Sequence, residues 1–180
     1  MKTLYIDTHN DINIVLLNED NIIREKKIID QKENSTILMP TIIQVIGDNN
    51  IDQIIVINGP GSFTGVRLGV TIAKTLAYTK NIPIKTLTYL ELIAINTLDE
   101  KKVVAFNDKN GYFVGYFNNN TLIKDYEYLD KDEFNKIKTK VTMDFNLDFK
   151  KVMAYMKTKE ALNPHFVNPI YVKKIEVEKW

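Results

Sequence analysis

The feature that most constrains the fold is a run of four branched apolar residues leading straight into a glycine-rich turn. Ile54-Ile55-Val56-Ile57 is continuous and rich in β-branched side chains, which predicts a central strand covered on both faces. The turn, Gly59-Pro60-Gly61-Ser62-Phe63-Thr64-Gly65, enters a helix predicted over 66–78. A buried strand, a glycine-rich turn and a helix in this order indicate an α/β sheet with a ligand-binding crevice at the strand's carboxyl end.

Short apolar runs on either side of this unit predict the rest of a first lobe. Residues 4–7, 12–17 and 22–29 form an expected three-stranded meander, whose third strand has the polar middle of an exposed edge. Ser35 is a candidate N-cap for a helix over 36–46, although Pro40 comes late for a first-turn proline. Residues 84–87 predict a short strand and residues 89–95 a helix.

A second unit is expected to begin at Lys101-Lys102. Residues 103–106 and 112–117 flank a turn containing Gly111, and residues 121–128 predict a third strand. Residues 130–137 and 148–157 are expected to be helical, and an apolar Ile170-Tyr171-Val172 lies in the tail after Pro164. We therefore expect two lobes, residues 1–100 and a shorter 101–180.

The glycine-rich turn departs from the two commonest phosphate loops. No Lys-Ser or Lys-Thr follows Gly65, which argues against a Walker loop, and no acid lies at the distance that a dinucleotide site uses for ribose. Two interpretations stay open: an anion or nucleotide contact, or glycines that only permit a tight turn and close helix packing. The candidate anion or nucleotide contacts are Asp7, Gly61, Ser62, Thr64 and Arg67.

The helix after the turn has more apolar surface than one sheet can cover. Arg67, Thr71, Lys74 and Tyr78 form a narrow polar stripe, and small residues recur every fourth position at Gly65, Gly69, Ala73 and Ala77. The helix over 36–46 is apolar around much of its surface as well. This excess of apolar helix surface predicts a partner interface, formed by Leu38, Ile42, Val45, Val66, Gly69, Val70, Ala73 and Ala77. The alternative is that the two helices cover each other and the sheet.

Composition restricts the classes of function. The 24 Lys and Arg nearly balance the 23 Asp and Glu, so no global field draws the chain to nucleic acid or an anionic membrane. Cysteine is absent, and no stretch approaches the length of a membrane span, so we expect a cytoplasmic protein. The two histidines, His9 and His165, are far apart in sequence, which predicts no metal site and no histidine partner for Ser62.

Four segments resemble one known family in order along the chain. Gly59 to Gly69 matches the GPGSFTG-x-R-x-G segment of the TsaB family, also called YeaZ. Leu4-Tyr5-Ile6-Asp7-Thr8 looks like that family's opening strand, residues 34–40 resemble its HSE-x-LLP stretch, and residues 168–173 resemble its closing P-x-YLR. The resemblance is strong through the first half of the chain.

The resemblance implies an actin-like ATPase (ASKHA, ribonuclease H-like) α/β core of two lobes, the second reduced. It implies a role in forming N6-threonylcarbamoyladenosine at position 37 of tRNA, as an accessory subunit without catalytic residues. The implied partners are a TsaD-like catalytic subunit and a TsaE-like ATPase, with tRNA bound indirectly, ATP and magnesium used only by the complex, and a homodimer when alone. Family members pair through the two apolar helices described above.

Two enzyme alternatives stay open beside this interpretation. A small ASKHA-type ATPase or phosphotransferase would act at Asp7 and residues 61–64. A glycoprotease-like peptidase is the other, and the scarcity of histidine argues against it. The sequence also departs from the family: His9 stands where Ser is usual, Asn34 replaces a His, and residues 107–114 only loosely follow DAR-x-x-EVY. These departures weaken any transfer of second-lobe roles.

Overall fold

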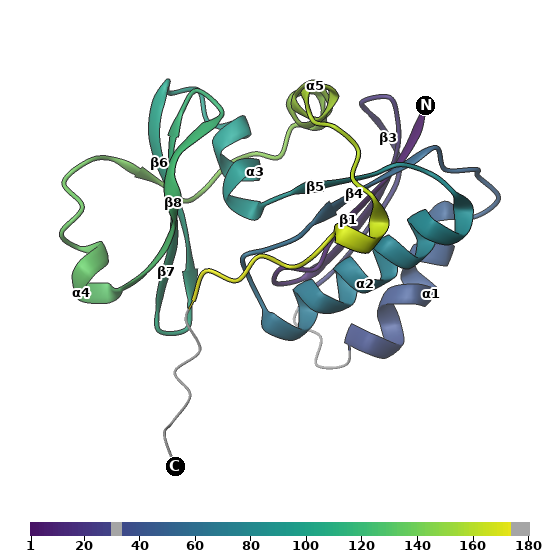
Figure 1. Cartoon of the computed structure of the whole chain (residues 1–180), viewed down its shortest axis with the longest axis horizontal. Helices are drawn as coiled ribbons and strands as arrows, with labels where there is room; N and C mark the ends of the chain where they lie inside the picture. The colour runs from purple at the N-terminus through teal and green to yellow at the C-terminus, as the bar shows by residue number, and fades with distance from the viewer. Residues whose placement is uncertain (30–33, 174–180) are drawn as a thin grey trace, which may run out of the picture.

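The computed structural model describes residues 1–29 and 34–173 and contains two β-sheets with helices between and around them (Figure 1). The first sheet has the order β3-β2-β1-β4-β5, formed by β1 (Lys2–Asp7), β2 (Ile12–Asn18), β3 (Asn21–Ile28), β4 (Gln53–Ile57) and β5 (Ile84–Leu87). The first three strands are an antiparallel meander, whereas β4 and β5 run parallel to β1. The expected α/β class is confirmed, and β3 is the exposed edge that its polar middle predicted.

Both faces of β4 are covered, as its unbroken apolar run predicted. Ile54 and Val56 belong to a core cluster shared with α1 (Asn34–Ile46) and α2 (Phe63–Lys80). Ile55 and Ile57 face a second cluster, which α3 (Tyr89–Asn96) and α5 (Phe149–Thr158) complete. Since side chains alternate along a strand, only a strand buried between two helical layers can be apolar at every position.

The helix boundaries differ from the predicted ones at both amino ends. Helix α1 begins at Asn34, so Ser35 lies inside it and is not its N-cap, and the helix continues through Pro40. Helix α2 begins three residues early, at Phe63, because the Ser62 hydroxyl accepts a hydrogen bond from the Gly65 amide and caps it. It ends at Lys80, two residues beyond the predicted end, because Asn81 adopts the left-handed conformation that stops a helix.

The second sheet has the order β8-β7-β6-β9, formed by β6 (Lys101–Asp108), β7 (Gly111–Asn118), β8 (Thr121–Asp130) and β9 (Val141–Thr142). The meander was expected, whereas the parallel strand β9 was not. Helix α4 (Lys131–Phe134) is a single turn where residues 130–137 were expected to be helical. An Asp130–Glu133 capping box starts it, but beyond Phe134 the segment offers almost no apolar side chains to pack.

Helix α3 joins the two sheets, and the end of the chain returns to the first one. One side of α3 places Leu92 and Ile95 against the first sheet, and the other places Leu90 and Ile93 against the second. Beyond α5, a short 3₁₀ helix (Pro164–Phe166) leads into a tail that runs along α2 toward the second sheet (Figure 1). The division at residues 100 and 101 stays a prediction. No helix within the described residues is both long and apolar enough to cross a membrane.

Candidate functional site

The candidate site is the edge of the first sheet where β1 and β4 end. Because these strands are parallel neighbours, their carboxyl ends meet, and Asp7 closes β1 while Asn58 follows β4. Helix α2 starts at the same edge, five residues after Asn58. This is the edge at which open α/β sheets place ligands, and it is where the sequence predicted a ligand-binding crevice.

His9 fills this edge with three polar contacts. Its backbone amide donates to Asp7 Oδ1 at 3.0 Å, and its ring Nδ1 lies 2.7 Å from the same oxygen. Its carbonyl oxygen accepts a hydrogen bond from the Ser62 amide at 2.6 Å. Both members of the Asp7–His9 pair are largely buried, with 8% and 12% of their side chains exposed. The carboxylate and the turn amide that a ligand would use are thus taken by the chain itself.

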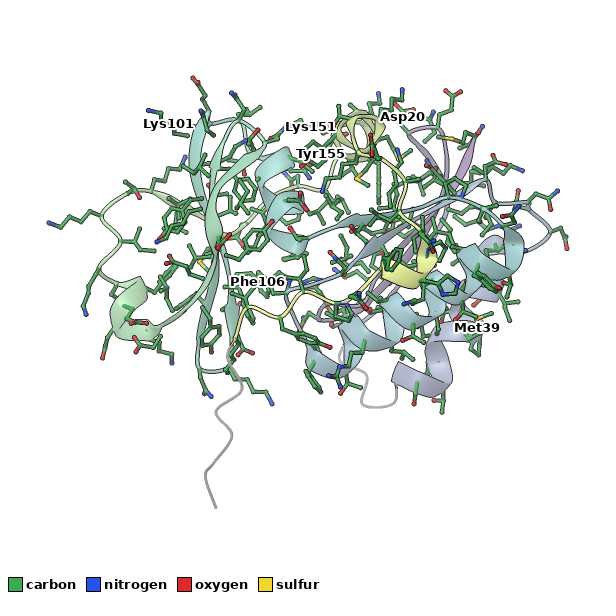
Figure 2. The ribbon with its side chains drawn as sticks, in the orientation of Figure 1. Asp20, Met39, Lys101, Phe106, Lys151 and Tyr155 are labelled. Carbon is green, nitrogen blue, oxygen red and sulfur yellow. The ribbon has the colours of Figure 1, made fainter. Side chains whose placement is uncertain are left out.

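The His9 ring also packs between aromatic side chains from two different elements. It stacks on Tyr89, with ring centroids 3.5 Å apart and planes 21° from parallel. The edge of Phe106 meets it at 5.6 Å, and Phe106 lies at the junction between the two sheets (Figure 2). Burial raises the pKa of Tyr89 to about 12, with the charge of Asp7 adding to the effect. Tyr89 therefore stays neutral beside the Asp7–His9 pair.

A nucleotide with magnesium does not fit the residues of this edge. Asp7 is paired with His9, and Gly61 packs so closely that a Cβ on it would lie 2.5 Å from the His9 carbonyl oxygen. The Ser62 hydroxyl is used as the α2 cap, and Thr64 faces solvent. Within residues 1–29 and 34–173, no three His, Cys, Asp or Glu side chains gather closely enough to hold a metal ion.

Arg67, the fifth candidate contact, turns away from Asp7 and toward the tail. Its guanidinium carbon lies 3.6 Å from the centre of the Phe63 ring and 5.3 Å from that of Tyr171, and its Nε donates to the Tyr171 hydroxyl at 2.5 Å. Arg67 is the fifth residue of α2, so it lies beyond the first turn, where a cation would oppose the helix dipole. Contact with two aromatic rings stabilises the guanidinium there. The five predicted contacts therefore do not converge on one ligand.

The eight residues predicted to meet a partner are instead core residues, and this is a correction. All eight are buried: Leu38, Ile42, Val45, Val66, Gly69, Val70, Ala73 and Ala77. The amino half of the small-residue seam packs on Thr8 of the same chain, whose hydroxyl donates to the Gly65 carbonyl at 2.8 Å and whose side chain lies where a Cβ on Gly69 would be. The backbone that approaches Gly65 is that of Thr8, the residue that follows β1.

Other apolar residues of the same two helices are at least partly exposed. Ile43 on α1 is 59% exposed, and Met39 lies on the outer side of that helix (Figure 2). Leu68, Ile72 and Leu76 are half-buried and recur every four residues on α2. We call Met39, Ile43, Leu68, Ile72 and Leu76 the outer helix face. Its apolar side chains were within the predicted helices, but periodicity alone did not separate them from the core.

A cleft of about 1040 Å³ opens between the turn before α2, the second sheet and the tail. Its walls include Phe63, Tyr128 and Tyr171. Lys173 joins the tail to the second sheet at this cleft, because its Nζ donates to Asp108 Oδ2 at 3.1 Å and to the Tyr128 hydroxyl at 3.2 Å. Sequence reasoning missed these residues, because nothing local to the second lobe signals that the tail returns to it.

Comparisons with known proteins relate this sequence to proteins of tRNA threonylcarbamoyladenosine formation. Residues 27–132 match the family model described as TsaD: tRNA N6-adenosine threonylcarbamoyltransferase. A curated relative, the tRNA threonylcarbamoyladenosine biosynthesis protein TsaB of Bacillus subtilis (strain 168), is 43% identical over 90 residues. That match spans 47% of this chain and 39% of the relative's length.

Two solved structures share the fold over nearly their whole length. A Pseudomonas aeruginosa protein described as uncharacterized, with similarity to peptidase YEAZ, superposes with a TM-score of 0.77 at 16% identity, covering 96% of this chain and 99% of that one. YeaZ from Pseudomonas aeruginosa gives 0.75 at 16% identity, covering 94% and 99%. These likenesses confirm the expected α/β fold, which is built on two sheets. Because the family model matches more than half of the chain, this chain belongs to the family described as TsaD: tRNA N6-adenosine threonylcarbamoyltransferase, and it is similar to TsaB over part of its length.

Proposed function

We propose that this protein is a non-catalytic subunit of the machinery that makes N6-threonylcarbamoyladenosine in tRNA, and that it pairs with and activates a TsaD-type catalytic subunit. The observation that carries the proposal is the filled edge at β1 and β4. Asp7 and the turn amide of Ser62 are held by His9, so the residues best placed for catalysis are committed to internal contacts. The named TsaB relative supports the choice of pathway.

The proposed partner surface is the outer helix face. Core residues of α1 and α2 anchor the two helices to the first sheet, while Ile43 is exposed and the other residues of the outer helix face are half-buried. Apolar side chains that meet solvent on adjacent helices are typical of a surface that another protein covers. The family resemblance places pairing on these same helices. A homodimer is the proposed state when the TsaD-type subunit is missing.

Further roles of the complex belong to the other subunits in this proposal. A TsaE-type ATPase joins the assembly, ATP and magnesium act there, and tRNA is reached through the partners, because the charge of this chain is balanced. We place the protein in the cytoplasm, where tRNA is modified. This chain contributes the protein contact and no cofactor of its own.

Co-purification with a TsaD-type protein from the same organism tests the proposal. This chain alone is expected to show no tRNA modification and no ATP turnover, whereas adding it to the TsaD-type subunit raises the yield of modified tRNA. Calorimetry with ATP and magnesium distinguishes the enzyme alternative. Saturable micromolar binding to the isolated chain would favour an ATPase or phosphotransferase over a subunit.

A further inference from the structure

His9 makes the polar contacts that a bound ligand would make at the end of β1 and β4. The Ser62 amide, at the start of α2, points where an anion would sit, and the His9 carbonyl accepts from it. The Asp7 carboxylate would bind a cation or a hydrogen-bond donor of a ligand, and the His9 amide and ring nitrogen lie against it instead. One residue thus satisfies both halves of the site.

The ring of His9 links elements that are far apart in the sequence. His9 lies in the turn between β1 and β2, Tyr89 begins α3, and Phe106 belongs to the second sheet. Tyr89 and Phe106 also meet edge to face, with centroids 5.0 Å apart. Stacked and edge-to-face arrangements are the favoured geometries of aromatic pairs. The imidazole therefore packs against two aromatic rings at the junction of the two sheets.

The glycine-rich turn is shaped around His9. A Cβ on Gly61 would lie 2.5 Å from the His9 carbonyl oxygen and 2.8 Å from the His9 Cβ. Such separations are too short for any side chain, so the turn needs glycine in order to approach His9 and not to approach a phosphate. This accounts for a glycine-rich turn in a chain whose other nucleotide-binding features are missing.

We propose that His9 is an internal ligand, which takes the place of a bound nucleotide at this edge and holds the two sheets together without one. The site itself is selective for a planar imidazole held by a carboxylate between aromatic rings. If His9 is removed, the vacated site is expected to take free imidazole. A phosphate-bearing ligand can enter only if His9 leaves. The inference concerns the chain alone and does not depend on the proposed partner.

Chemical rescue tests this inference in the full-length chain. His9→Gly removes the imidazole that lies against Asp7, Tyr89 and Phe106, and we expect the Tm to fall by about 10 °C. Millimolar imidazole is expected to restore part of that loss, while leaving the Tm of the wild type unchanged. His165→Gly is the matched control, because His165 is the other histidine and lies exposed on the tail. Equal stability of His9→Gly and wild type, or an imidazole effect that is absent or the same in all three proteins, would overturn the proposal.

A measurement on the wild type decides the matter if His9→Gly does not fold in either buffer. The chain has two histidines, so their ring protons can be resolved by NMR. Stacking on Tyr89 predicts that the His9 ring protons lie upfield of those of His165, and that they keep their positions when ATP and magnesium are added. Equal shifts for the two histidines, or a saturable displacement of the His9 signals by ATP and magnesium, would refute the role of internal ligand.

Discussion

Two adjacent isoleucines on α1 allow partner binding to be separated from folding. Ile43 is 59% exposed, whereas Ile42 is fully buried in the first core cluster. Burying a whole branched side chain contributes about 1.5–3 kcal/mol, so covering the exposed part of Ile43 in an interface is worth about 1–2 kcal/mol. Ile43→Ala is therefore expected to weaken association with a TsaD-type subunit about tenfold. Ile43→Glu adds an unpaired charge to the interface and should abolish detectable binding.

Ile42→Ala is the matched variant with the opposite outcome. It removes buried methylene and methyl groups, which costs about 2–5 kcal/mol of unfolding free energy, but it touches no outward surface. Urea denaturation measures the stability of each variant, and calorimetric titration with the TsaD-type subunit measures its affinity. We expect Ile43→Glu to fold like the wild type without binding, and folded Ile42→Ala to bind like the wild type. Wild-type affinity in Ile43→Glu would refute the outer helix face as the partner surface.

Three further predictions concern stability. Gly61→Ala should lose about 1–3 kcal/mol in urea denaturation, because its Cβ would press on the His9 carbonyl; wild-type stability would contradict the packing. Lys102→Met should lower the free energy of unfolding by about 1–3 kcal/mol in the same assay, since Lys102 Nζ donates to the carbonyls of Ala94 and Thr97 at the end of α3. An unchanged urea midpoint would show that water replaces these hydrogen bonds. Burial raises the pKa of Asp108, but hydrogen bonds from the Lys109 backbone, Lys173 and Tyr128 outweigh it and leave that pKa below its ordinary value. The ion pair therefore contributes its full stabilisation above the unfolded pKa of about 3.9 and loses it as the pH falls through the lower folded pKa of Asp108. Lys173→Met should cost about 0.5 kcal/mol at neutral pH and nothing in strong acid; a cost that persists in acid would contradict the ion-pair origin.

Local pattern was enough to predict the elements of the first lobe. The run from Ile54 to Ile57 identified a strand between two layers, and the two core clusters on its faces confirm that. Ser62, Gly65 and Asn81 fix the ends of α2 through caps that are local in sequence. Such signals need no knowledge of distant residues, although the helix predicted over 66–78 missed the cap at Ser62.

The site could not be assigned in this way, because its contacts join distant segments. The line from Gly65 to Ala77 was identified as a close-packing seam, but periodicity does not say whether Thr8 or another protein fills it. His9 was noted only as a departure from the usual Ser, and its contacts with Ser62, Tyr89 and Phe106 depend on how the two sheets meet. Likewise, Tyr171 reaches Arg67 only because the tail returns along α2.

The test of the central claim is the amount of N6-threonylcarbamoyladenosine in tRNA from cells that lack this gene, read by mass spectrometry of nucleosides. If the machinery needs this subunit, the modification is lost in the deletion strain and returns with a wild-type copy of the gene. Ile42→Ala is expected to restore it as well, provided that this variant accumulates, whereas Ile43→Glu is not. An unchanged level of the modified nucleoside in the deletion strain would contradict the proposed function.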